Sequence, residues 1–282
     1  MHKFSEKIGE PKMISIIGKI KTVKAKYSKL IFLLFLILLC SFAQFTVEGV
    51  AEETVDLTTD DGIKLKCAYF PSSVPNAPGI ILLPDTRCDR MNFGSIPIKL
   101  NEAGFAVLAM DLRYKDIIAK AKNQKEQIRT IQKQDLMALV KYDTKSGINF
   151  LSSKKEVDPK RIALIGTSLG SRVAIIAGVE YDLKALVLIS LSGEEAFPGY
   201  KPIKQLLSDY GEKPILFMTA EKDWGGKFKA AEHNKRYYDW KNGKKELKIW
   251  PGSGHGVGIL SKKEAIKFVA AWLKSNILQA NF

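Results

Sequence analysis

Strand-like and helix-like segments alternate along this chain of 282 residues, and this alternation is the feature that most restricts its fold. Five short runs are almost continuously apolar, as is typical of parallel strands covered by helices on both faces. Three further runs are rich in β-branched or alternating residues. The eight candidate strands span residues 54–58, 63–70, 79–83, 105–110, 161–165, 185–190, 214–219 and 246–250.

Helical patterns separate most of these runs, at residues 92–103, 135–152, 169–179, 228–241 and 262–275. Strand–helix–strand units connect in a right-handed sense and produce a mostly parallel sheet. The turn Thr59-Asp60-Asp61-Gly62 joins the first two runs as a hairpin, which predicts an antiparallel N-terminal edge. The predicted fold class is therefore α/β, with one eight-stranded, mostly parallel sheet that carries helices on both faces. We expect the charged segment 115–134 to be an outer helix or a flap, and any small cap to lie within 191–213.

The first 51 residues predict an export leader, which leaves residues 52–282 as the folded domain. Five lysines between positions 19 and 29 precede an apolar run at 30–40, and small residues follow at Ser41 and Ala43. This order is typical of a secretory signal peptide cleaved after Ala43, with Ala51 as a second candidate. An uncleaved leader would span a bilayer with residues 30–47. A buried core helix is the alternative. Either export outcome places the domain in the periplasm, outside the cell or on the outer face of the cytoplasmic membrane.

Charge and cysteine content bear on partners and compartment. The net charge is +14, and residues 1–43 contribute +6 of it. The remaining lysines are scattered and flank acidic residues, which indicates a solvated basic surface rather than a nucleic-acid partner. Cys67 and Cys88 would meet an oxidising compartment after export. We expect them on neighbouring elements, either as a disulfide or as two unpaired thiols.

The motif Gly166-x-Ser168-x-Gly170 lies where the run 161–165 becomes the helical pattern 169–179. A tight turn that needs small residues would explain it. A chemical interpretation is that Ser168 is a nucleophile held on a strand-to-helix elbow, with its oxygen projecting at the carboxyl end of the sheet. The first helical amide, at Leu169, would then stabilise an oxyanion.

A nucleophilic serine needs a base, and the chain has three histidines. His2 lies in the leader, and His233 lies in a polar helical pattern where a solvated surface position is expected. His255 lies in a glycine-rich loop after the last strand run, where the base of such a serine is expected. Asp223 follows the run 214–219 and is the predicted orienting acid, with Glu221 as its rival. No metal-ligand spacing or dinucleotide fingerprint accompanies these residues, so no metal or organic cofactor is expected.

Four stretches between residues 55 and 275, IALIGTSLGSRVAI, ILFMTAEKD, ELKIWPGSGHG and GFAVLAMDLR, together resemble the α/β-hydrolase family. The likeness is to its small carboxylesterase and dienelactone-hydrolase-like branch. It implies acyl transfer from a small ester to water by Ser168, Asp223 and His255. It also implies that the Thr86 amide is the second oxyanion donor.

This chain departs from the family pattern in the loop after the third strand, where Pro84-Asp85 replaces the usual His-Gly. Asp85, Arg87 and Arg90 either shape the substrate site or belong to a solvated loop. The altered loop 84–90 and the charged segment 115–134 keep a second hypothesis open. In it, a membrane-tethered hydrolase-like domain binds a ligand or partner without turnover.

Overall fold

The structure is a computed structural model that describes residues 52–86, 88–113, 136–193, 200–226 and 229–278. The predicted leader, Arg87 and the segment 115–134 lie outside these ranges, so the division at residue 51 stays a prediction. Among the helices in the described ranges, none is both long enough and apolar enough to cross a bilayer.

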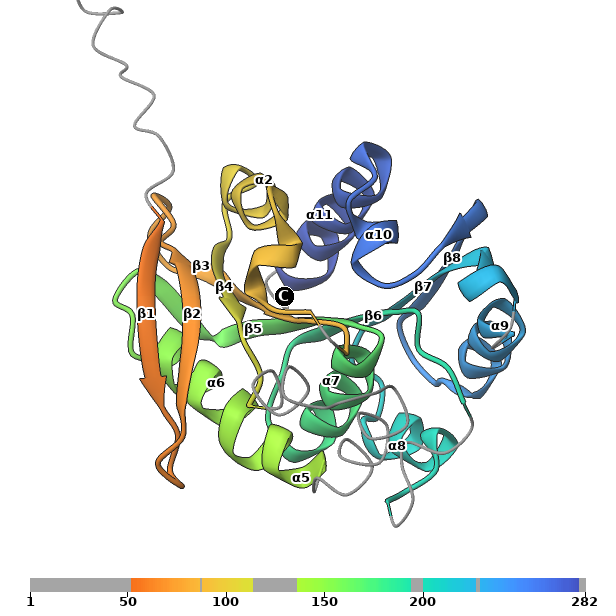
Figure 1. The fold of residues 1–282 in the computed structure, drawn as a ribbon, viewed down its shortest axis with the longest axis horizontal. Coiled ribbons are helices and arrows are strands. Elements are labelled where there is room, and N and C mark those ends of the chain that lie inside the picture. The colour runs from red at the N-terminus through yellow and green to blue at the C-terminus, as the bar shows by residue number, and fades with distance from the viewer. Residues whose placement is uncertain (1–51, 87, 114–135, 194–199, 227–228, 279–282) are drawn as a thin grey trace, which may run out of the picture. The chain divides into compact units, whose positions relative to one another are not determined.

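In the described part of the chain, eight strands form one sheet in the order β1-β2-β4-β3-β5-β6-β7-β8 (Figure 1). The β1–β2 and β2–β4 pairs are antiparallel, and all the other pairs are parallel. This arrangement confirms the predicted α/β sheet with an antiparallel N-terminal edge. The strands are β1 (Glu53–Thr58), β2 (Lys64–Phe70), β3 (Ala77–Leu83), β4 (Ala106–Met110), β5 (Val157–Thr167), β6 (Ala185–Ile189), β7 (Ile215–Asp223) and β8 (Lys245–Gly254).

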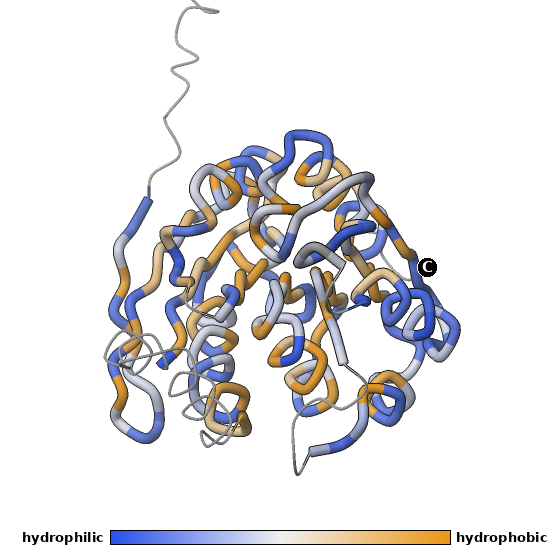
Figure 2. The backbone as a smooth tube through the Cα atoms, turned by 45° about the vertical axis from the view of Figure 1, so that its right-hand side comes forward, coloured by the Kyte–Doolittle hydropathy of each residue, from blue (hydrophilic) through white to orange (hydrophobic). Residues whose placement is uncertain are grey.

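Helices cover both faces of this sheet, which explains why its central strands are continuously apolar. In β3, Ile80 and Leu82 pack in one cluster while Ile81 and Leu83 pack in the other, because successive side chains point to opposite faces. All four side chains are fully buried. Burial of each such side chain stabilises the fold by about 1.5–3 kcal/mol. Figure 2 shows the hydrophobic strands in the interior and hydrophilic segments around them.

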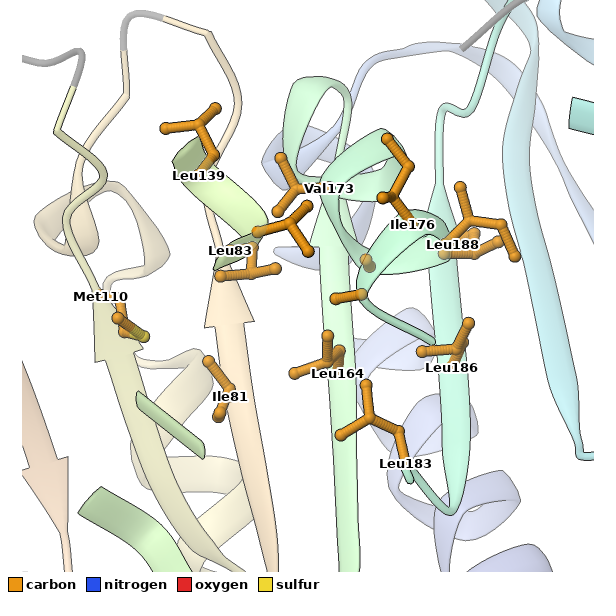
Figure 3. Packing of buried hydrophobic residues seen from close by; sticks show 14 of the residues in the cluster. Ile81, Leu83, Met110, Leu139, Leu164, Val173, Ile176, Leu183, Leu186 and Leu188 are labelled. Carbon is orange, nitrogen blue, oxygen red and sulfur yellow. The ribbon is translucent and has the colours of Figure 1, made fainter. Parts of the chain in front are cut away.

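The two helical layers differ in their members. One layer holds α5 (Leu136–Ala138), the π-helical turn η2 (Leu139–Thr144), α6 (Lys145–Ser152), α7 (Leu169–Glu180), α8 (Ile203–Asp209) and α9 (Ala230–Trp240). The other holds α2 (Ile96–Glu102), α10 (Val257–Leu260) and α11 (Lys263–Ile277), together with the short 3₁₀ turn η1 (Arg90–Phe93). Figure 3 shows how Val173 and Ile176 of α7 pack near Leu83, Leu186 and Leu188 of the strands. The helix α8 lies in the connection 191–213 and packs in the same cluster, so the described part of that connection belongs to the body of the domain.

An ionic cluster ties the β1–β2 turn to the body of the domain. The Arg113 guanidinium donates to both oxygens of Asp61 at 2.6 and 2.9 Å. Its Nε and its backbone N–H donate to the buried carboxylate of Asp143 in η2, at 2.7 and 2.8 Å. The antiparallel edge is therefore held by Arg113, a largely buried guanidinium shared between the exposed carboxylate of Asp61 and the buried carboxylate of Asp143.

The strand order also separates the two cysteines, Cys67 and Cys88. β4 lies between β2, which carries Cys67, and β3, which precedes Cys88. The expectation that Cys67 and Cys88 lie on neighbouring elements is therefore wrong, because β4 separates β2 from β3 in the sheet. Both are free thiols, and burial raises the pKa of Cys67 to about 12 and that of Cys88 to about 11.

Candidate active site

Ser168 is the single residue between β5 and α7, at the carboxyl end of the sheet. Its backbone has φ 50° and ψ −111°, a strained conformation for a residue with a side chain. A Cβ atom at Gly166 would collide with the carbonyl of Gly170, and one at Gly170 would collide with the carbonyl of Leu83. The two glycines are thus required because the backbone folds back on itself and against β3 at this point. The geometry is that of a nucleophile elbow.

The surroundings of Ser168 leave its hydroxyl and the adjoining amide available. The side chain is half-buried, and no hydrogen bond of its hydroxyl occurs among the described residues. The Gly170 N–H donates to the Pro84 carbonyl at 3.2 Å, which fixes the loop after β3 beside the elbow. Within the described ranges the Leu169 N–H has no backbone partner, as expected of the first amide of a helix. Thr86 follows two residues after Pro84 on the same loop.

Asp223 and His255 meet at the carboxyl ends of β7 and β8. Asp223 is the last residue of β7 and is paired in register with Gly254, the residue before His255. The Asp223 side chain is 1% exposed, and its Oδ1 lies 2.5 Å from Nδ1 of His255. An ionised carboxylate only accepts hydrogen bonds, so Nδ1 carries the proton and Nε2 keeps a lone pair. This is the tautomer that a general base requires.

The second oxygen of Asp223 is held by two hydroxyl groups that the sequence analysis did not identify. Ser190 Oγ donates to Oδ2 of Asp223 at 2.6 Å, and Thr219 Oγ1 donates to the same atom at 3.0 Å. Ser190 Oγ also accepts the N–H of Gly256 at 2.8 Å. One buried hydroxyl therefore joins the acid to the loop that carries His255. A signal existed in the sequence, since Ser190 and Thr219 are polar residues at the carboxyl ends of apolar runs.

Glu221, the rival of Asp223, is exposed and lies apart from His255. Its Oε2 accepts the N–H of Gly252 at 3.0 Å, in an exposed position on β8. Regular alternation would place Glu221 and Asp223 on the same face, but the β7–β8 register shifts between Ala220 and Lys222. At this irregularity Glu221 stays exposed, and Asp223 beyond it is buried. The structure thus brings Asp223, and not Glu221, to the histidine.

His233 is not a freely solvated side chain. It is half-buried on α9, and its Nδ1 accepts the N–H of Gly193 at 3.0 Å. Asn234 and Tyr237 of the same helix donate to the carbonyls of Leu191 and Gly193. The expectation of a surface histidine is wrong because α9 packs against the loop that follows β6, and this loop begins with Ser190. The role of His233 is to hold that loop.

Asp85 lies inside the site rather than on a solvated loop. Its Oδ2 accepts the N–H of Val257 at 3.4 Å, and a Cβ atom at Gly256 would collide with its carboxylate. Burial raises the pKa of Asp85 above its ordinary value. Arg90 is held by Asp111, which accepts from its guanidinium at 2.7 Å and from its backbone N–H at 2.9 Å. Within the described ranges, no cluster of three His, Cys, Asp or Glu side chains could hold a metal ion.

Comparison with known proteins gives two relatives that match part of this chain in sequence. Two uncharacterized proteins of Mycobacterium tuberculosis, from strains CDC 1551 / Oshkosh and H37Rv, are each 29% identical over 167 residues. That match covers 57% of this chain and 54% of each relative, so the chain spans about half the length of these relatives.

Solved structures extend the likeness to the whole sheet. A dienelactone hydrolase from Anabaena variabilis superposes with a TM-score of 0.59 at 18% identity, over 82% of this chain and 98% of its own. An esterase from Pyrococcus furiosus superposes with a TM-score of 0.60 at 20% identity, over 81% of this chain and 92% of its own. These likenesses show the α/β-hydrolase fold.

The sequence profile of the dienelactone hydrolase family matches residues 66–272, a range that includes the elbow, the acid and the histidine. Because this match covers well over half of the chain, the chain belongs to the dienelactone hydrolase family.

Proposed function

We propose that this chain is an exported serine hydrolase that cleaves a small carboxylic ester through an acyl-serine intermediate. One observation carries the proposal. The Asp223–His255 hydrogen bond and the strained Ser168 elbow lie at the same edge of one parallel sheet. A tight turn alone would account for Gly166 and Gly170, but not for a buried acid that orients a histidine in a loop next to it.

In the proposed acylation step, Ser168 Oγ attacks the ester carbonyl carbon while His255 Nε2 takes the hydroxyl proton. The carbonyl oxygen becomes negatively charged, and the N–H groups of Leu169 and Thr86 stabilise it. The Asp223 carboxylate stabilises the imidazolium. His255 then returns the proton to the alcohol oxygen, the ester C–O bond breaks, and an acyl-serine and a free alcohol remain.

Deacylation repeats these steps with water. His255 removes a proton from water, the resulting hydroxide attacks the acyl carbon, and His255 protonates Ser168 Oγ as the carboxylic acid leaves. Every proton moves through one imidazole, so the orientation of His255 controls both halves of the cycle. This dependence is why the hydrogen bonds around Asp223 matter to the rate.

Support for an ester substrate comes from the family and from the neighbours of known fold. Dienelactone is a cyclic ester, and the Pyrococcus furiosus protein is named an esterase. Support for export comes from the basic stretch 19–29 followed by the apolar run 30–40. N-terminal sequencing of the protein recovered from an expressing bacterium tests this part, and a mature chain that begins at residue 44 or 52 is the expected result.

The test of the proposed activity uses the purified full chain and a p-nitrophenyl ester series from acetate to decanoate. Turnover is expected for the wild type and for Ser208→Ala, whose hydroxyl lies exposed on α8, but not for Ser168→Ala. A fluorophosphonate is expected to label the first two proteins and not the third. If the wild type neither turns over nor labels, the elbow is only a turn, and the ligand-binding domain without turnover replaces this proposal.

A further inference from the structure

Trp224, the residue directly after the acid, lies against the imidazole of His255. The two ring centroids are 5.2 Å apart, and the ring planes are almost perpendicular at 84°. Trp224 opens the short 3₁₀ turn η3 (Trp224–Gly226) with φ 48°, a left-handed conformation that costs a residue with a side chain about 1 kcal/mol. The chain accepts this cost in a turn that brings the indole to the histidine.

About half of the indole remains open to solvent. Trp224 is 48% exposed, although tryptophan is a large apolar side chain that usually lies mostly buried. Among the exposed large hydrophobic side chains of the described ranges, Trp224 is the one in ring contact with His255. An apolar surface beside a reacting group is a substrate-binding feature, because a bound molecule would cover it.

The chemistry of His255 decides which part of the substrate reaches this surface. Nδ1 faces Asp223, so Nε2 is the atom that protonates the departing alcohol. That transfer requires the alcohol oxygen within about 3 Å of Nε2. The carbon group attached to this oxygen therefore lies beside the imidazole, within reach of the indole packed on the same ring. The acyl carbon chain is bonded instead to the carbon that Ser168 attacks.

We propose that Trp224 is a specificity-determining residue that contacts the alcohol portion of the ester. The preferred substrates are then esters of apolar, ring-bearing alcohols. This inference rests on the proposed function, since it needs His255 to act on a leaving alcohol. A purely supporting role, in which Trp224 only holds the imidazole in place, predicts a different result: all esters would lose rate equally when the indole is removed.

The experiment compares two substrate series on the purified full chain. One series keeps the acetyl group and changes the alcohol from ethanol to cyclohexylmethanol to benzyl alcohol, which are primary alcohols of similar acidity. The other keeps ethanol and lengthens the acyl group from acetyl to hexanoyl. Wild type, Trp224→Ala and Trp224→Phe are measured together with Val74→Ala, an equally exposed apolar position between β2 and β3.

In Trp224→Ala, the ratio of kcat/KM for benzyl acetate to that for ethyl acetate is expected to fall about tenfold. Trp224→Phe should fall less, and Val74→Ala should keep the wild-type ratio. The acyl-chain preference should not change in any variant. An equal loss on all alcohols, or a changed acyl preference, overturns the proposal.

If the wild type is labelled by a fluorophosphonate but does not discriminate among alcohols, this proposal alone fails. If it neither labels nor turns over, the proposed function fails as well.

Discussion

Ser190 is the residue whose removal tests the arrangement of the acid most directly. Ser190 is 1% exposed, and its hydroxyl makes two hydrogen bonds, to the Asp223 carboxylate and from the Gly256 N–H. The Ser190→Ala variant loses both, and the burial of this site leaves water no easy access to replace them. The carboxylate keeps its bond from Thr219 Oγ1.

The size of the effect follows from the charge on one partner. A hydrogen bond to an ionised group contributes about 1.5–3 kcal/mol. Since about 1.4 kcal/mol corresponds to a tenfold change in rate, kcat is expected to fall roughly 10–100-fold. KM should stay near the wild-type value, because no substrate atom touches Ser190 in the proposed mechanism. The measurement is steady-state hydrolysis of a p-nitrophenyl ester across a full range of concentrations.

Two control variants test whether the loss of kcat in Ser190→Ala comes from the missing hydroxyl. Ser190→Gly removes the same hydroxyl, so it should lose as much kcat as Ser190→Ala. Because glycine adopts the φ of 57° without strain, Ser190→Gly should unfold at a higher temperature than Ser190→Ala. Ser192→Ala changes a hydroxyl on the same loop that makes no hydrogen bond among the described residues, and it should keep the wild-type rate. A Ser190→Ala enzyme with kcat within threefold of the wild type would refute the reasoning.

Three further results are expected from the structure. Gly166→Ala should destabilise the fold by several kcal/mol in urea unfolding, because its Cβ atom would collide with the backbone of Gly170. Burial raises the pKa of Asp85, so the folded chain holds that proton more tightly than the unfolded chain, and this contribution to stability falls as the pH rises above about 4. Asp85→Asn should therefore raise the melting temperature at pH 7, and the gain should shrink toward pH 4. Asp143→Ala should cost about 1.5–3 kcal/mol in urea unfolding, because Arg113 loses its buried partner and keeps only its bonds to Asp61.

The central strands were predictable because burial on both faces leaves a direct trace in the sequence. The polar ends of strands leave no such pattern in the sequence. β5 begins at Val157 and β8 runs on to Gly254, beyond the apolar runs at 161–165 and 246–250, since backbone pairing extends a strand without apolar side chains.

The residues of the candidate site also differ in how far the sequence alone predicts them. Ser168 stands in a local motif, and the segment that holds His255 is short and rich in glycine, so both were identifiable along the chain. Ser190 and His233 are recognisable in the sequence only as polar residues of their segments, and their contacts were not predictable because their partners come from other elements. Ser190 contacts Asp223 because β6 lies beside β7 in the sheet. His233 contacts Gly193 because α9 packs against the loop that follows β6. A pattern within one segment carries no record of such a contact.

The position of β8 at the edge of the sheet gives the two halves of the site unequal local stability. Among the strands that the structure describes, β8 pairs with β7 alone, whereas β5 is paired on both sides and leads into a helix with a fully buried face. Edge elements open more often than central ones through local unfolding. His255 directly follows this edge strand, so we expect its surroundings to open at a lower temperature than the elbow. The amide protons of β8 should exchange with solvent faster than those of β5, and activity should disappear at a lower temperature than the helical circular dichroism.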